Sequence, residues 1–144
     1  MNKEALKQWA LALWSGEYEQ GQGGLCTLVN GGFLYCCLGV AAELLYKQLG
    51  MTKEQDEHSD ALMYAFQGNR QGGYMPAEIG EYLGIESSFR DIKSMGYDPI
   101  LIDPETGYSY QASYWNDSGK KSFKEIAMMI NHTFDLGLDL TDKD

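Results

Sequence analysis

Residues 25–37 read LCTLVNGGFLYCC, and this stretch decides the fold class. Two short runs of apolar, β-branched and aromatic residues flank Asn30-Gly31-Gly32, a pattern typical of a β-hairpin. A three-residue loop would place Cys26 opposite Cys36, whereas a two-residue Asn-Gly loop would place Cys26 opposite Tyr35. The sequence therefore predicts the hairpin and leaves both registers open.

Around this hairpin, apolar residues recur at helical spacing. The predicted helices span residues 3–15, 38–49, 75–83 and 123–134. The last is marked most clearly, because Ser122 and Glu125 have the S-x-x-E spacing of a capping box. Such a box supplies partners for the first N–H groups of a helix, which otherwise have none.

A second hairpin is predicted from residues 99–102 and 108–111, because the loop between them begins with Asp-Pro and ends with Gly. Hairpins and helices do not alternate as βαβ units, which argues against a doubly wound sheet. We therefore predict an α+β class. Residues 1–144 would form a single compact domain, with two short β-hairpins packed against three to four helices.

Three segments are less regular in pattern. Residues 51–73 are predicted to be an irregular insertion, with a possible short helix at Ser59–Phe66. The stretch from Tyr114 to the capping box reads as a loop rich in Asn, Asp and Gly. Residues 135–144 are predicted to be an acidic, frayed tail.

The charge balance excludes several classes of partner. The formal net charge is -10, and the 11 Lys and Arg residues are scattered. Because nucleic acids and anionic membranes attract clustered basic residues, we expect the protein to bind neither. A basic protein partner is compatible with the charge, and so is a surface that is merely soluble. No targeting or membrane-spanning stretch is recognisable, so we expect a cytosolic location.

The three cysteines are expected to be buried apolar residues, because an odd number in a reducing compartment argues against disulfides. Cys26 lies in the hairpin. Cys36 and Cys37 lie where a strand meets a helix, and a helix N-terminus promotes ionisation of a thiol. A nucleophile also needs a base, and the only histidines, His58 and His132, have no recognisable orienting partner. We predict no catalytic residue.

Motifs for cofactors and metals are incomplete. In residues 114–125, Gly and Glu fit two positions of a calcium-binding EF-hand loop, but Tyr114 stands where the first carboxylate is required. Residues 122–127 resemble the first helix of a helix-turn-helix motif, but the sequence after them is acidic. No phosphate-binding loop and no zinc spacing is recognisable. We expect no cofactor and no metal.

Aromatic and amide side chains stand in the glycine-rich loops, and such residues often line pockets and interfaces. The candidates for ligand or partner binding are Tyr18, Gln20, Gln22, Tyr74, Trp115 and Asn116. The same residue types also tie loops to a core. The sequence alone does not separate these two roles.

Four stretches resemble a family of small uncharacterised proteins that is common in tailed bacteriophages and prophages. They are Leu13–Leu25, Phe33–Val40, Met75–Ile85 and Trp115–Ala127. The most specific pieces are Cys-Cys-Leu-Gly-Val and Asn-Asp-x-Gly-x-Ser-Phe-x-Glu-Ile-Ala, although this chain has one additional residue, in Lys120-Lys121, before Ser122. The resemblance implies a phage or prophage origin and action inside the infected host. It implies no activity and carries over no catalytic residue.

We therefore expect a phage-encoded accessory protein that acts in the host cytoplasm by binding a host protein or small molecule, without catalysis. One alternative is a thiol-dependent enzyme that uses Cys36 or Cys37. Another is an acidic decoy that mimics DNA, which requires carboxylates arrayed on one face. The sequence spreads its carboxylates along the chain, so the decoy ranks last. The oligomeric state stays open.

Overall fold

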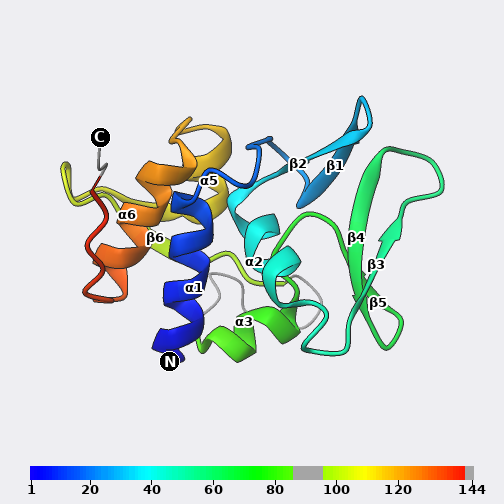
Figure 1. The fold of residues 1–144 in the computed structure, drawn as a ribbon, viewed down its shortest axis with the longest axis horizontal. Coiled ribbons are helices and arrows are strands. Elements are labelled where there is room, and N and C mark those ends of the chain that lie inside the picture. Colours follow the sequence, from blue (N-terminus) through cyan, green and yellow to red (C-terminus); the bar gives the residue numbers. More distant parts are fainter. Residues whose placement is uncertain (86–95, 142–144) are drawn as a thin grey trace.

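The larger antiparallel sheet lies at one side of the molecule, and most of the helices, together with a second, smaller hairpin, lie at the other (Figure 1). The computed structural model describes residues 1–85 and 96–141. The helices in these ranges are α1 (Lys3–Trp14), α2 (Cys37–Leu45), α3 (Ala77–Leu83), α5 (Ala112–Asp117) and α6 (Phe123–Thr133). The strands are β1 (Cys26–Val29), β2 (Gly32–Tyr35), β3 (Thr52–Gln55), β4 (Ala61–Phe66), β5 (Asn69–Gln71), β6 (Ile100–Ile102) and β7 (Ser109–Gln111). The predicted α+β class, with helices packed against hairpins, is confirmed.

The hairpin that decides the fold class forms with a two-residue turn. β1 pairs with β2, and Cys26 lies opposite Tyr35. Asn30 and Gly31 have φ angles of 49° and 80°, so both central residues are left-handed, as a type I′ turn requires. Cys26 and Cys36 therefore do not face each other across the ladder.

The prediction that residues 51–73 are irregular is wrong. This segment contributes β3, β4 and β5, which extend the first hairpin into a five-stranded sheet in the order β2-β1-β4-β3, with β5 also paired to β4. The helix predicted at Ser59–Phe66 is a strand, because β4 pairs with three neighbours and buries Tyr64 and Ala65. A two-residue turn, Gln67-Gly68, with φ angles of 49° and 86°, connects β4 to β5.

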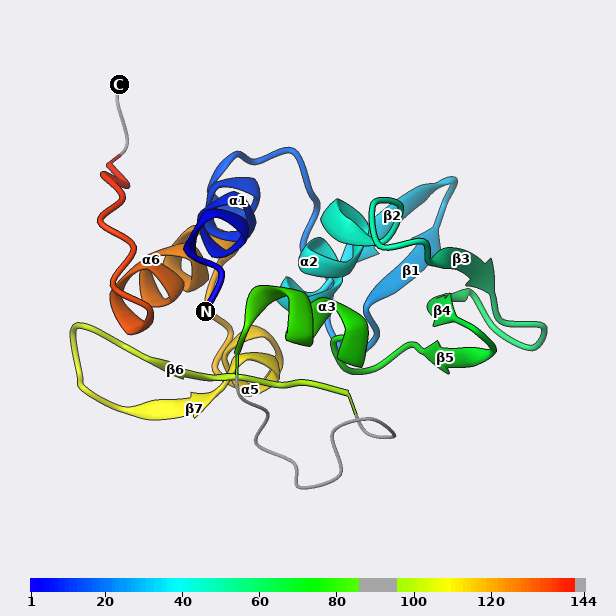
Figure 2. The same ribbon diagram turned by 90° about the horizontal axis from the view of Figure 1, so that it is seen from below.

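α2 is the central helix, and it lies between the sheet and the other helices in both ribbon views (Figures 1 and 2). It contacts α1, α3, α5 and β2, and most of its residues are buried. A helix that is apolar on nearly all sides must be covered on all sides. At Gly39 the helix approaches the backbone at Leu25 so closely that a Cβ atom would lie 1.7 Å from the Leu25 carbonyl oxygen.

The N-terminal helix packs against the helix at the other end of the chain. One face of α1 is buried, with Leu6, Trp9 and Leu13 at helical spacing, and α1 lies alongside α6 in both views. The Trp9 indole N–H donates to the Cys37 carbonyl at 2.9 Å, which also fixes α1 to the start of α2. The core therefore joins residues from both ends of the described chain.

The stretch after the second hairpin is helical where a loop was expected. β6 and β7 pair as predicted, with Leu101 opposite Tyr110, and α5 follows β7 directly. The Asp98 carboxylate accepts a hydrogen bond from the Ser113 N–H at 3.0 Å in the first turn of α5. Burial raises the pKa of Asp98, although the Ser113 donors oppose this effect. This acceptor thus lies 15 positions before Ser113, and no local sequence pattern at the start of α5 reveals it.

The frayed tail is also a wrong prediction for residues 135–141. Leu136 is buried, and Leu138 and Leu140 pack against the core. The Asn131 side chain donates to the Leu138 carbonyl and accepts from the Leu138 N–H, which ties this segment to α6. Residues 142–144 lie outside the described chain.

The capping box predicted at the start of α6 is present. Ser122 Oγ accepts from the Glu125 N–H at 3.1 Å, and Glu125 Oε1 accepts from the Ser122 N–H at 3.0 Å. Replacing Ser122 with alanine is expected to lower the free energy of unfolding by about 1 kcal/mol, the usual cost of a lost N-cap acceptor. Urea unfolding followed by tryptophan fluorescence measures this change. Ser118→Ala, at an exposed position after α5, is the matched control; equal losses in the two variants would contradict the prediction.

Candidate functional site

Two of the amides predicted from sequence meet in the structure. Gln20 lies in the loop after α1, and Asn116 lies in α5, 96 residues further along. The Gln20 amide nitrogen donates to Asn116 Oδ1 at 3.0 Å and to the Lys121 carbonyl at 2.8 Å, and Gln20 Oε1 accepts from the Phe123 N–H at 3.2 Å. Gln20 thus fastens the loop to both α5 and the first turn of α6.

Asn116 is completely buried, and both of its polar atoms have partners. Besides the Gln20 amide, its Oδ1 accepts from the Cys37 N–H at 3.1 Å. Its Nδ2 donates to the Gly21 carbonyl and to Asp117 Oδ1, each at 2.8 Å. One side chain therefore connects the glycine loop, α5 and the start of α2.

An open pocket of about 540 Å³ lies beside these amides. We call it the amide pocket, and it is lined by Gln20, Gly21, Gln22, Asn116, Lys120, Lys121, Ser122 and Glu125. Three of the six candidate residues, Gln20, Gln22 and Asn116, share this pocket. Gln22 is exposed at its rim, and its amide nitrogen lies 3.4 Å from the Asp117 carbonyl.

The three aromatic candidates do not line the amide pocket. Trp115 is buried behind it, where its indole N–H donates to the Leu101 carbonyl at 3.0 Å. Tyr18 packs edge-on against Tyr35, with ring centroids 5.4 Å apart. The Tyr74 N–H donates to the side chain of Gln71 near β5. The structure therefore brings the amides together and places the aromatic rings elsewhere.

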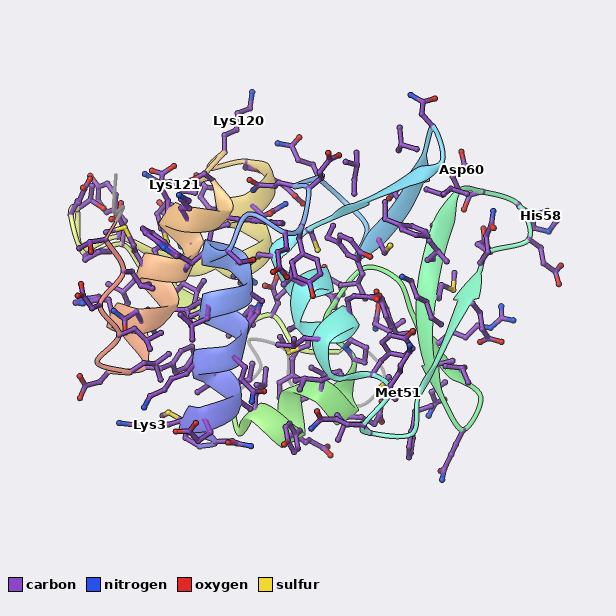
Figure 3. The ribbon with its side chains drawn as sticks, viewed as in Figure 1. Lys3, Met51, His58, Asp60, Lys120 and Lys121 are labelled. Atoms are coloured by element: carbon purple, nitrogen blue, oxygen red, sulfur yellow. The ribbon has the colours of Figure 1, made fainter. Side chains whose placement is uncertain are left out.

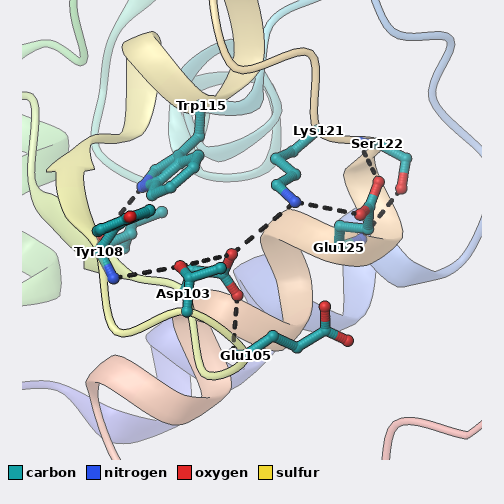
Figure 4. A network of polar contacts seen from close by, with 9 residues as sticks. Asp103, Glu105, Tyr108, Trp115, Lys121, Ser122 and Glu125 are labelled. Carbon is teal, nitrogen blue, oxygen red and sulfur yellow. Dashed lines mark hydrogen bonds and ion pairs between the residues drawn. The ribbon is translucent and has the colours of Figure 1, made fainter.

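Lys121 crosses from the amide pocket to the turn between β6 and β7 (Figure 4). Its Nζ lies 3.8 Å from Asp103 Oδ2 and 3.6 Å from Glu125 Oε2. The pKa of Asp103 is lowered, first by the Glu105 N–H that donates to it and also by Lys121. The pKa of Glu125 is lowered, first by the Ser122 N–H and also by Lys121. Both carboxylates are thus held ionised, and Lys121 offsets one of their two negative charges.

The thiols are sealed in the core. Cys26, Cys36 and Cys37 are all buried, and Cys37 lies under α5 with its sulfur 3.5 Å from the Ala112 carbonyl. Burial raises the pKa of the Cys36 thiol to about 12 and raises the pKa of the other two thiols. Both imidazoles are exposed on other parts of the molecule: His132 on α6, and His58 on the outer loop between β3 and β4 (Figure 3). No thiol of the described chain has an imidazole as its hydrogen-bond partner.

All three thiols are expected to resist iodoacetamide at pH 7.5 in the folded protein, because a buried thiol with a raised pKa is neutral and inaccessible. Mass spectrometry after an hour of exposure measures the labelled fraction. Complete labelling in urea serves as the control for reagent activity. Rapid labelling of one cysteine under native conditions would contradict the prediction and revive a thiol nucleophile.

In residues 1–85 and 96–141, no group of three His, Cys, Asp or Glu side chains is placed to hold a metal ion. None of the helices found in these ranges combines the length and the apolar character needed to cross a bilayer.

Comparison with known protein families finds a match for most of the chain. The profile of a family described as a domain of unknown function (DUF8296) matches residues 1–134. The chain belongs to this family. No curated protein and no solved structure matches the chain. The DUF8296 match spans α1 to α6 and contains every residue of the amide pocket, whereas residues 135–141, which pack beside α6, follow it.

The sequence analysis did not identify the residues that α6 and the loop before it contribute to the amide pocket. Ser122 and Glu125 were identified, but only as a capping box, and Lys120 and Lys121 only as an additional residue in a loop. The capping box itself contained a signal for their position, because it places residues 120–122 at the start of a helix. The start of this helix lies against Gln20 only through a contact across about a hundred residues, which no local pattern contains.

Proposed function

We propose that this protein is a phage- or prophage-encoded accessory protein that acts in the host cytoplasm by binding a host protein or small molecule, without catalysis. The amide pocket is the proposed contact site. The observation that carries the proposal is the convergence of Gln20, Gln22 and Asn116 on one open pocket of about 540 Å³. The phage origin rests on the sequence resemblance described above.

The pocket walls support binding because they are already ordered. Gln20 and Asn116 are held by hydrogen bonds to α2, α5 and α6, so a ligand does not have to immobilise them. Binding to a preformed site avoids the entropic cost of ordering loops and side chains. A volume of this size falls within the range of small-molecule sites, roughly 300–1,000 Å³.

The environment of the thiols supports the proposal that the protein acts without catalysis. A cysteine nucleophile requires an accessible thiolate and a base within hydrogen-bond reach. The buried position of Cys36 and Cys37, the direction of their pKa shifts and the distant, exposed imidazoles all oppose that chemistry.

Capture from host lysate tests the proposal. The immobilised protein is incubated with lysate, and bound proteins and metabolites are identified by mass spectrometry. Gln22→Trp is expected to abolish the specific capture, since it places a large ring at the rim of the pocket. Gln8→Trp, which changes an exposed glutamine on α1, is the matched control and should retain it. Capture of nothing by the unmodified protein, or equal capture by both variants, would overturn the proposal.

A further inference from the structure

The amide pocket continues along α6. A second hollow, of about 40 Å³, shares Lys121 and Glu125 with the amide pocket, and a third, of about 390 Å³, shares Pro104 and Met128 with the second. The third hollow ends against the segment that carries Leu138. These three hollows, which we call the α6 groove, adjoin one another through shared lining residues.

The lining residues of α6 occupy one face of the helix. Glu125, Met128 and His132 are three or four positions apart, so they stand on one stripe, while Ile126 and Ile130 on the opposite side are buried. A helix of 11 residues is roughly 16 Å long at about 1.5 Å per residue. Roughly five residues of extended chain cover that length. The dimensions of the α6 groove therefore suit a short extended segment of polypeptide.

The charges of the α6 groove favour a basic occupant. Its second and third hollows are lined by Asp103, Glu105, Glu125 and Asp135, against one lysine, Lys121. Lys121 is shared by Asp103 and Glu125. Within the described chain, Glu105 and Asp135 form no ion pair, although Lys3 Nζ donates to the Asp135 backbone carbonyl at 3.2 Å. Both carboxylates are exposed and remain for an occupant to neutralise.

Lys120 does not offset this negative charge. It lines the rim of the amide pocket, but its side chain extends away from the body of the protein (Figure 3). Apolar surface lies between the carboxylates, because Met128 is 41% exposed and Pro104 is exposed beside it. Methionine adapts its shape to varied partners, which makes it common at binding surfaces for peptides. An occupant with alternating basic and apolar side chains would fit both kinds of contact.

We propose that the α6 groove binds an extended segment of a partner protein that carries Lys or Arg residues between apolar ones. This inference rests on the proposed binding function and specifies the partner. The net charge of -10 would draw such a segment toward the protein, and Glu105 and Asp135 would pair with its cations. Met128 and Pro104 would contact its apolar side chains.

Selection from a random library of seven-residue peptides displayed on yeast tests the inference with the full-length protein. Enriched peptides should carry at least two Lys or Arg residues separated by apolar ones. Their affinity, measured by fluorescence anisotropy, should fall roughly tenfold in the Glu105→Gln/Asp135→Asn variant, as expected for the loss of two exposed ion pairs. The Glu57→Gln/Asp60→Asn variant removes the same charge at the outer loop between β3 and β4 and should bind within about twofold of the unmodified protein.

The outcomes separate this inference from the proposed function. Selection of acidic or neutral peptides, equal losses in the two variants, or selection of no peptide would overturn the α6 groove as a peptide site. If Gln22→Trp still abolished capture from lysate in those cases, the amide pocket would remain a binding site for another ligand. Thermal melting of each variant confirms that it is folded before its affinity is compared.

Discussion

Gly39→Ala is expected to destabilise the protein by about 3 kcal/mol or more, although alanine is the better helix former by roughly 1 kcal/mol. The new Cβ would lie 1.7 Å from the Leu25 carbonyl oxygen and 2.6 Å from its carbon. Leu25 cannot move aside easily, because its N–H donates to the Gly72 carbonyl and its own carbonyl accepts from the Cys36 N–H. The clash therefore forces apart the sheet and the central helix.

Urea unfolding, followed by tryptophan fluorescence, measures the loss if the variant folds, and circular dichroism shows whether it folds. Gly24→Ala is the matched control. A Cβ there would meet its nearest atom, the Gly72 carbonyl oxygen, at an ordinary 3.5 Å. That variant should change the free energy of unfolding by less than about 1 kcal/mol. Equal effects of the two substitutions would show that α2 does not pack against Leu25 as described.

Asn116→Ala is expected to cost about 3 kcal/mol, because it leaves a buried N–H and a partly buried carbonyl without their partners. The Cys37 N–H loses its hydrogen bond to Oδ1 at 3.1 Å, and the Gly21 carbonyl loses its hydrogen bond from Nδ2 at 2.8 Å. Each unsatisfied buried group costs about 1–3 kcal/mol. Gln20 retains the Lys121 carbonyl as a partner, so its share of the loss is smaller.

Thermal and urea unfolding measure the Asn116→Ala loss, and Asn69→Ala is the control, since Asn69 is exposed on β5. The control is expected to stay within about 0.5 kcal/mol of the unmodified protein. A double-mutant cycle with Gln20→Ala should show coupling, because the two side chains share a hydrogen bond of 3.0 Å. Strictly additive losses would contradict the network described here.

The features that sequence predicts correctly have local causes. The β1–β2 hairpin and the Ser122–Glu125 capping box each depend on signals within a few neighbouring residues, although the sequence left the register of the hairpin open. β4 was misjudged because six apolar residues are compatible with a strand or a helix, and pairing with β1 and β3 decides between them. The α5 helix was missed for a similar reason, since Asp98, which accepts from the Ser113 N–H in its first turn, lies before the second hairpin.

The candidate site also combines residues that the sequence can nominate with long-range contacts that it cannot predict. Residue type was enough to nominate Gln20, Gln22 and Asn116, but it equally nominated Tyr18, Tyr74 and Trp115, which do not line the amide pocket. Their convergence on one pocket depends on how the loop after α1 meets α5, a contact across 96 residues. The carboxylates of the α6 groove, such as Glu105 and Asp135, had no local signal, since exposed acidic residues are common throughout this chain.

The packing of α1 against α6 has a consequence for synthesis on the ribosome. The β1–β2 and β4–β5 hairpins can close as soon as they emerge, because their strands are adjacent in sequence. α1 emerges before these hairpins, yet the helix that covers it is translated more than a hundred residues later. Until then, Leu6 and Trp9 lack part of their cover. The growing polypeptide therefore exposes an apolar stripe to chaperones until α6 has been translated.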